Sequence, residues 1–220
     1  MDSGRRQFLG RWGAVVTGVA APFAFSRPVF QESHARPDLG AGANTATDLQ
    51  TDSGAGTSHE RFMRLAIEQA QRNPMWPFGA VIVDTRTGDV RGSGVNAGAD
   101  NPVLHGEVVA MNDYVGRHGN RGWADTTLYT TTGEPCSMCM SAMAWADLRR
   151  VVRGSSIDEI RRTGIQQIAL TAREVAASAR SFYTPELLLG DVLADRTNRL
   201  FQEAERLRQR LPDTPSANTS

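Results

Sequence analysis

The feature that most constrains this chain is a pair of short segments rich in side chains that bind metals or move protons. The first is His105-Gly106-Glu107, and the second is Gly133-Glu134-Pro135-Cys136-Ser137-Met138-Cys139. The second segment contains both cysteines of the 220-residue chain. A framework of several disulfides therefore cannot hold this protein together, and its stability has to come from a hydrophobic core.

The two cysteines are spaced for a shared ligand. Cys136 and Cys139 stand at i and i+3 where a helix is predicted to begin, so both thiols lie on one face and can reach a single ion. A helix N-terminus favours the thiolate, and Pro135 suits the entry to a helix. By itself this pair stays ambiguous, because Cys-x-x-Cys in an exported protein is also the pattern of a dithiol redox centre.

The upstream segment favours a metal. His105 begins another predicted helix, and Glu107 follows two residues later. Residues two apart point in different directions along a helix, so these two share a site only at its axial end. One nitrogen and two sulfur ligands would leave a fourth tetrahedral position open, which is typical of catalytic Zn²⁺. Such a zinc lowers the pKa of its water to about 7, and Glu107, which is not a ligand, is then free to transfer the proton.

The hydrophobic pattern from residue 58 onwards alternates between helix and strand periods. After a candidate N-cap at Ser58, apolar residues recur at helical spacing, and 79–84 with 89–95 is typical of a hairpin of two strands. Further helices are predicted at 104–115, 137–148, 155–162 and 191–210, and further strands at 127–131, 150–153 and 165–170. This alternation predicts an α/β fold, with a five-stranded mixed sheet between helices in three α/β/α layers.

Outside the domain predicted at 58–210, the chain carries accessory segments. Residues 1–35 are predicted to be a signal peptide: Arg5-Arg6 followed by Phe8-Leu9 resembles the twin-arginine pattern, and the apolar run after it is short for a membrane span. A retained anchor or a chance basic start are the alternatives. Residues 36–57 are expected to be a flexible linker and 211–220 a disordered tail. The expected location is periplasmic or extracytoplasmic, reached through the twin-arginine export machinery.

His-x-Glu followed by Pro-Cys-x-x-Cys is the signature of zinc-dependent deaminases, and the chain resembles the cytidine-deaminase-like superfamily over roughly residues 59–154. The resemblance implies that His105, Cys136 and Cys139 bind zinc. It also implies that Glu107 protonates the ring nitrogen and the departing ammonia, and that the fold is a five-stranded mixed sheet flanked by helices. Relatives of this kind commonly form homodimers.

Three shorter stretches, 77–83, 134–136 and 144–146, look most like the guanine deaminase branch. By that resemblance Phe78, Asn96 and Trp145 contact the base. A core position for Trp145 and a turn-forming role for Asn96 are the alternatives. Gly106 departs from the branch, where Ala is usual, and His-Gly-Glu is more familiar from fungal cytosine deaminase. The long last helix looks more like that of tRNA adenosine deaminases.

The function expected from these residues is hydrolytic deamination of a small nucleobase or nucleoside, with guanine favoured and ammonia released. Such an enzyme is a hydrolase acting on C–N bonds of cyclic amidines, in purine metabolism. The alternatives are a tRNA wobble adenosine deaminase, a cytosine deaminase, and a non-catalytic zinc or dithiol protein. The numbers of basic and acidic residues are equal, 24 each, which weakens the case for a nucleic-acid partner. A local basic face would have to come from Arg149, Arg150, Arg153, Arg161 and Arg162.

Overall fold

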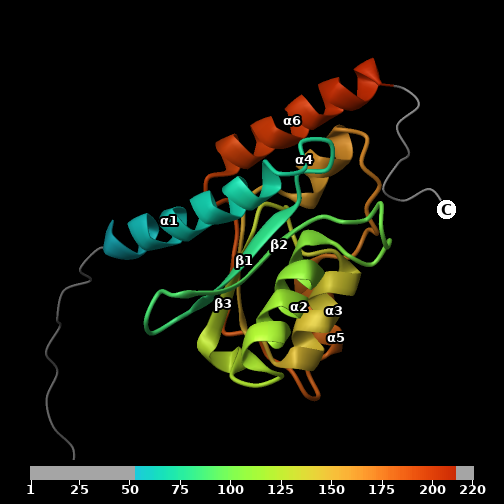
Figure 1. Ribbon diagram of the computed structural model, residues 1–220. Helices are drawn as coiled ribbons and strands as arrows, with labels where there is room; N and C mark the ends of the chain where they lie inside the picture. The colour runs from blue at the N-terminus through green and yellow to red at the C-terminus, as the bar shows by residue number, and fades with distance from the viewer. Residues whose placement is uncertain (1–52, 212–220) are drawn as a thin grey trace, which may run out of the picture. The chain divides into compact units, whose positions relative to one another are not determined.

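The computed structural model describes residues 53–211, with side chains from residue 58, as a five-stranded sheet covered by helices on both faces (Figure 1). The elements in chain order are α1 (Ser53–Ala70), β1 (Gly79–Asp84), β2 (Val90–Val95), α2 (Gly106–His118), the 3₁₀ helix η1 (Trp123–Asp125), β3 (Thr126–Thr130), α3 (Ser137–Ala146), β4 (Arg150–Arg153), α4 (Ile157–Arg162), α5 (Ala172–Ser178), β5 (Leu187–Leu189) and α6 (Ala194–Arg210).

The sheet is mixed, as the sequence predicts. Its strand order is β2-β1-β3-β4-β5. The pairs β1–β2 and β1–β3 are antiparallel, whereas β3–β4 and β4–β5 are parallel. The hairpin turns at Asp84, whose carboxylate accepts the backbone N–H of Arg86 and Thr87, and Gly88 there takes a φ of 75° that favours glycine. The antiparallel hairpin and the parallel crossovers together confirm the α/β fold class.

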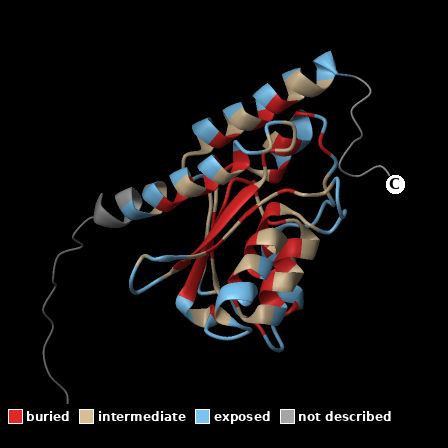
Figure 2. Ribbon diagram, viewed as in Figure 1, coloured by how far each residue is buried: buried red, intermediate tan, exposed pale blue. Residues whose placement is uncertain are grey.

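Consecutive residues of strand β1 point to opposite faces of the sheet and pack in two different hydrophobic cores. Ala80 and Ile82 of β1 pack in one cluster with α2, α3 and α5, while Val81 and Val83 pack in another with α1 and the partly buried Leu200 of α6. Figure 2 shows the central strands β1 and β3 buried between the helices. The sheet therefore separates a layer of α2, α3 and α5 from a layer that contains α1 and α6.

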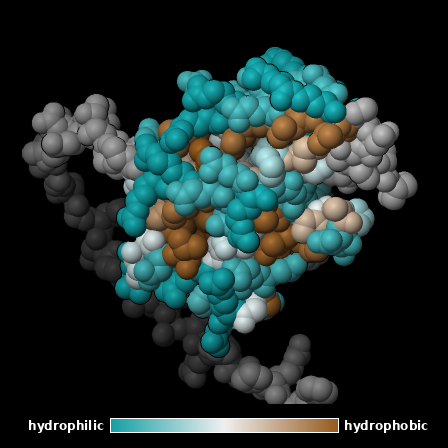
Figure 3. All heavy atoms as spheres, turned by 45° about the horizontal axis from the view of Figure 1, so that its top comes forward, coloured by the Kyte–Doolittle hydropathy of each residue, from teal (hydrophilic) through white to brown (hydrophobic). Residues whose placement is uncertain are grey.

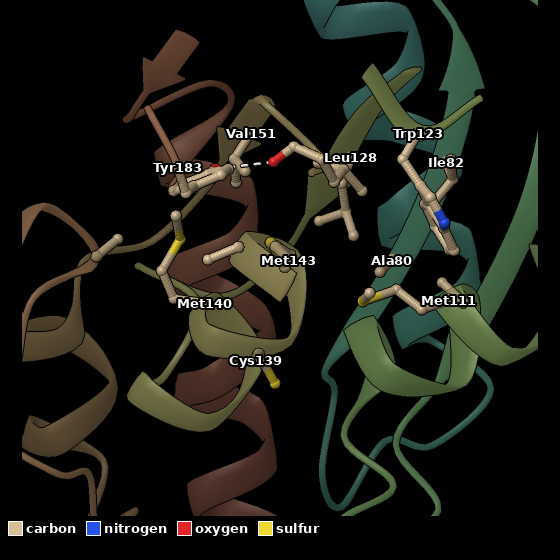
Figure 4. Packing of buried hydrophobic residues seen from close by; sticks show 14 of the residues in the cluster. Ala80, Ile82, Met111, Trp123, Leu128, Cys139, Met140, Met143, Val151 and Tyr183 are labelled. Carbon is tan, nitrogen blue, oxygen red and sulfur yellow. Dashed lines mark hydrogen bonds between the residues drawn. The ribbon is translucent and has the colours of Figure 1, made fainter. Parts of the chain in front are cut away.

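The core beneath α3 is built largely from methionine and aliphatic side chains. Met140 and Met143 of α3 are fully buried and point toward Leu128 and Val151 of the sheet (Figure 4). Tyr183 closes this core, and its hydroxyl donates to the carbonyl of Leu148 at 2.8 Å. The phenol is 2% exposed, and burial raises its pKa to about 12. This packing fixes α3, and with it the cysteine segment at its N-terminus.

Two elements differ most from the sequence predictions. Helix α1 begins at Ser53, five residues before the predicted start at Ser58, and so includes the end of the segment expected to be linker. The fifth strand is Leu187–Leu189 rather than 165–170. Ile165 packs in a cluster with Ile160 and Phe201, while Ile168 and Leu170 are exposed, so the segment forms a loop. Its apolar residues suggested a strand, but only the first of them is buried.

The predicted signal peptide at 1–35, most of the predicted linker and most of the predicted tail lie outside the described residues. Within the part that is described, no helix combines the length and apolar character needed to cross a membrane.

Candidate active site

The two chemically distinctive segments lie at the N-termini of two helices that pack on the same face of the sheet (Figure 1). His105 is the N-cap residue of α2 and Cys136 is the N-cap residue of α3, and both have extended backbone torsions, with ψ of 158° and 164°. Gly106 permits the close entry of α2, because a Cβ there would lie 2.4 Å from the carbonyl oxygen of Phe78. Both helix N-termini therefore reach one point at the end of the sheet.

The three predicted metal ligands lie together. His105 Nδ1 is 3.4 Å from Cys136 Sγ and 3.7 Å from Cys139 Sγ, and the two sulfurs are 3.6 Å apart. Tetrahedral Zn²⁺ with Zn–S of about 2.3 Å and Zn–N of about 2.05 Å would separate its sulfurs by about 3.8 Å and sulfur from nitrogen by about 3.5 Å. The donor set and its spacing fit a zinc ion, and Glu107 is not a member of this group.

The protons of this trio are distributed unevenly. A hydrogen bond from Cys139, opposed by burial and aided by His105, lowers the pKa of the Cys136 thiol to about 4. The same hydrogen bond, together with burial, raises the pKa of Cys139 well above its ordinary value. The hydrogen bond to Cys136 raises the pKa of His105. The metal-free trio thus has one thiolate ready to bind a cation and one thiol that must give up its proton when it does.

Glu107 is the second residue of α2, in the first turn of the helix, and is 1% exposed. Its Oε1 accepts hydrogen bonds from the hydroxyls of Thr132 at 3.0 Å and Thr130 at 3.2 Å, and its Oε2 lies 3.7 Å from Cys139 Sγ. Burial raises the pKa of this carboxyl. A buried carboxyl held beside the metal ligands, with its proton affinity increased, is suited to take up and return a proton during a reaction.

These groups open into a cavity of about 340 Å³. Its lining combines apolar walls with a few amide and carboxylate groups, which is the usual composition of a small-molecule site. The lining residues are Trp76, Phe78, Asn96, His105, Glu107, Thr132, Glu134, Cys136, Met138, Ile165, Gln166, Gln167 and Ile168. The structure therefore brings six of the predicted site residues to one place or its edge: Phe78, Asn96, His105, Glu107, Cys136 and Cys139.

Asn96 and Phe78 both line the cavity, and each also makes a contact with another part of the protein. Asn96 is 5% exposed and lines the cavity, yet its Oδ1 also accepts the backbone N–H of Gly98, so the turn-forming alternative describes it as well. The ring of Phe78 is nearly parallel to that of His105, with centroids 6.5 Å apart. Phe78 therefore joins the cavity wall to a metal ligand.

Trp145 lies on the surface of α3 and does not line the cavity: it is 79% exposed and stacks on Phe182 with centroids 4.7 Å apart. The alternative of a core tryptophan is wrong. Helix α3 turns Met143 and Ala144 toward the core, and the next residue consequently lies on the solvent side.

Several cavity residues were not predicted. Glu134 belongs to the cysteine segment, and its carboxylate accepts the backbone N–H of Ala172 at the start of α5. Trp76 precedes a proline just before β1, a signal for a turn that carries no information about a cavity. Gln166 and Gln167 lie in the stretch whose apolar pattern favoured a strand, so no sequence signal placed them at the site.

Comparisons with known proteins agree with this arrangement. Residues 56–155 match the cytidine and deoxycytidylate deaminase zinc-binding region. The chain is 33% identical over 100 residues to a tRNA-specific adenosine deaminase of Rickettsia bellii, which covers 43% of this chain and 68% of that protein. It is 35% identical over 100 residues to a tRNA-specific adenosine deaminase of Streptococcus pyogenes, over 43% of this chain, and spans 61% of that relative's length.

A solved structure of a guanine deaminase from Nitrosomonas europaea shares the fold. It covers 76% of this chain and 100% of its own chain with a TM-score of 0.57, at 18% sequence identity. The name of that structure refers to guanine, whereas the names of the two relatives refer to adenosine in tRNA. The comparisons therefore support a deaminase without selecting one base.

Proposed function

Because the chain belongs to the family of the cytidine and deoxycytidylate deaminase zinc-binding region, we propose that it is a zinc-dependent hydrolytic deaminase of a small nucleobase or nucleoside, with guanine favoured. The observation that carries the proposal is the buried Glu107 carboxyl beside the His105, Cys136 and Cys139 trio at the cavity wall. A structural zinc site has no use for such a carboxyl, whereas hydrolysis requires one.

The residues of the chain divide the reaction between them. His105, Cys136 and Cys139 would hold Zn²⁺, which when bound supplies the Lewis acidity that lowers the pKa of a water. Glu107 takes a proton from the attacking water, whose oxygen bonds to the amino-bearing ring carbon. Glu107 delivers that proton to the ring nitrogen, then takes the remaining proton of the added hydroxyl and passes it to the departing amine, so that ammonia leaves and a carbonyl remains. The hydroxyls of Thr130 and Thr132 fix Glu107 for these transfers.

The charge of the cavity favours a neutral substrate. Among the described residues that line it there is no arginine, and the sequence contains no lysine. Two carboxyl groups, Glu107 and Glu134, face the same space. A phosphate on the substrate would meet these carboxyl groups with no arginine or lysine in the cavity lining to bind it, so a free base or nucleoside suits the site better than a nucleotide.

The names of the curated relatives favour a second candidate, a tRNA adenosine deaminase. Such an enzyme needs cations available to phosphates near its cavity. Four of the five arginines that could have formed a basic face are instead engaged with carboxylates. These pairs are Arg149 with Asp147 and Glu186, Arg150 with Glu186, Arg153 with Glu134 and Asp191, and Arg162 with Glu159. This neutralised surface supports the small-molecule function over the nucleic-acid one.

An ammonia-release assay tests the proposal. Zinc-loaded protein is incubated with guanine, cytosine, adenine, their nucleosides and an RNA hairpin with a loop adenosine. Release from one of the small molecules, with Glu107→Gln retaining zinc but losing turnover, is the expected result. Release from the RNA alone, with RNA binding that weakens steeply with salt, would replace the proposal by the tRNA function. Glu107→Gln at the wild-type rate would refute the role of Glu107.

Two further parts of the proposal concern assembly and location. The chain forms a homodimer, to which the exposed, stacked Trp145 and Phe182 contribute an apolar contact; light scattering of Trp145→Ser would then report a smaller mass. The precursor is exported by the twin-arginine machinery to the periplasm. Arg5→Lys with Arg6→Lys in a tagged full-length chain should keep it in the cytoplasm, and unchanged location would count against export by this route.

A further inference from the structure

A single arginine of α6 joins two segments that line the cavity. Arg208 Nη1 donates to the carbonyl of Met75 at 2.7 Å, and its Nη2 donates to the carbonyl of Thr163 at 2.9 Å. The guanidinium also lies over the ring of Trp76, 4.7 Å from the centroid. Met75 immediately precedes the cavity residue Trp76, and Thr163 stands two residues before the cavity residue Ile165. Arg208 thus bonds both segments at once.

The chemistry of the side chain makes this a rigid connection. A guanidinium is planar and holds its donors in a fixed fork, so two carbonyls bonded to its two terminal nitrogens keep a fixed relative position. Both bonds are partly buried and link residues far apart in sequence. A lysine would keep the positive charge over Trp76 but has one nitrogen on a flexible stem.

The rest of α6 supports the same walls. Phe201 is 1% exposed, its ring lies 5.1 Å from that of Phe78, and it packs with Ile165. In Figure 3 the outer side of α6 is hydrophilic and hydrophobic surface gathers below it. Helix α6 therefore contacts the cavity walls through apolar packing at Phe201 and through directional bonds at Arg208.

The opposite end of the turn before β1 has its own anchor. Asn73 donates through Nδ2 to the carbonyl of Asn96 at 2.9 Å and accepts the backbone N–H of Trp76 at 3.1 Å. Asn73 therefore ties the turn to the end of β2. Apolar packing also links the turn to the loop at 165–168, since Trp76 packs against the cluster that contains Ile165, and Arg208 adds the directional hydrogen bonds that join the turn to the start of the loop.

We propose that Arg208 is a positioning residue for base selection, which sets the relative position of Trp76 and the loop at 165–168. It acts on substrate binding and on discrimination between one-ring and two-ring bases, and leaves the proton transfers of Glu107 unaffected. The inference rests on the proposed deaminase function for its kinetic part. Its structural part, the coupling of the two wall segments, stands independently of turnover.

The kinetic test uses the full-length, zinc-loaded chain with Arg208→Lys and Arg208→Met, the second of which keeps the apolar stem. Arg206→Met is the matched control, because Arg206 is exposed on the same helix. For guanine, both Arg208 variants should raise KM roughly 10-fold and reduce the preference for guanine over cytosine, with kcat and zinc content unchanged. Arg206→Met should match the wild type. Unchanged KM and preference in both Arg208 variants would overturn the inference.

Amide hydrogen exchange of the substrate-free, zinc-loaded protein provides the independent readout. Arg208→Met should accelerate exchange in residues 73–78 and 163–168 and leave the start of α2 and α3 unchanged. Exchange unchanged in both segments would refute the coupling, whatever the activity. Absence of ammonia release by the wild type, with the exchange effect present, would instead refute the proposed function and leave the coupling in place.

Discussion

Thr132→Val tests whether the hydroxyls around Glu107 support catalysis. The substitution keeps the shape of the side chain and removes the hydroxyl that donates to Glu107 Oε1 at 3.0 Å. Glu107 is 1% exposed, so no bulk water replaces that donor. The hydroxyl of Thr130, at 3.2 Å from the same oxygen, is then the remaining hydroxyl contact among the described residues. The carboxylate should lose both fixation and stabilisation of its ionised form.

The expected magnitude follows from the kind of bond that is lost. A hydrogen bond to a charged group contributes about 1.5–3 kcal/mol, which corresponds to roughly a 10- to 150-fold change at 1.36 kcal/mol for each factor of ten. We expect kcat/KM for ammonia release to fall within that range. The zinc content should stay at the wild-type level, because Thr132 contacts none of the three metal ligands.

Thr127→Val is the matched control for this experiment. Thr127 belongs to β3, the strand that ends two residues before Thr132, and is 5% exposed, but it lies at the end of β3 away from Glu107. Its substitution should leave kcat/KM unchanged while imposing a comparable change of a buried threonine. A wild-type rate for Thr132→Val, or an equal loss in both variants, would refute the assigned role of the hydroxyl.

Three further outcomes are expected. In the metal-free protein, burial raises the pKa of Glu107 above 4.5, so the folded state binds this proton more tightly than the unfolded chain. The free energy of unfolding therefore falls as pH rises. Relative to the wild type, Glu107→Gln should become more stable as pH rises from mildly acidic to mildly basic, as measured by urea unfolding. Tyr183→Phe removes the bond to Leu148 and should lower the free energy of unfolding by about 1 kcal/mol without changing kcat. Phe78→Ala should raise KM for the base, whereas Trp145→Ala should not, and equal effects on KM would contradict the cavity described here.

Local spacing explains why the metal centre was predictable. Cys136 and Cys139 share a face because one helical turn separates them, and His105 can join Glu107 only at the end of a helix. Such statements need no knowledge of distant contacts. The strands were predictable for a similar reason, since consecutive residues of a strand, such as Ile82 and Val83, point to opposite faces of the sheet and pack in two different cores.

The failures share one physical cause. The periodicity of apolar residues predicts which residues are buried, but it does not predict which part of the protein packs against them. The stretch 165–170 was predicted as a strand from its apolar residues, but only Ile165 is buried, against Ile160 and Phe201, and Leu187–Leu189 forms the edge of the sheet instead. The base contact predicted for Trp145 comes from a resemblance in sequence, whereas the exposure of its side chain depends on how α3 packs on the sheet.

The sequence by itself therefore determined the α/β fold class and the residue types of the zinc site, because the periodicity of helices and strands and the spacing within each of the two motifs are local properties of the chain. Only the tertiary structure decided how the cavity is completed. Thr132 beside Glu107, the loop at 165–168 and the bonds of Arg208 join segments separated by between 25 and 133 residues. Contacts across such separations depend on the packing of the whole domain and leave no periodic pattern in the chain.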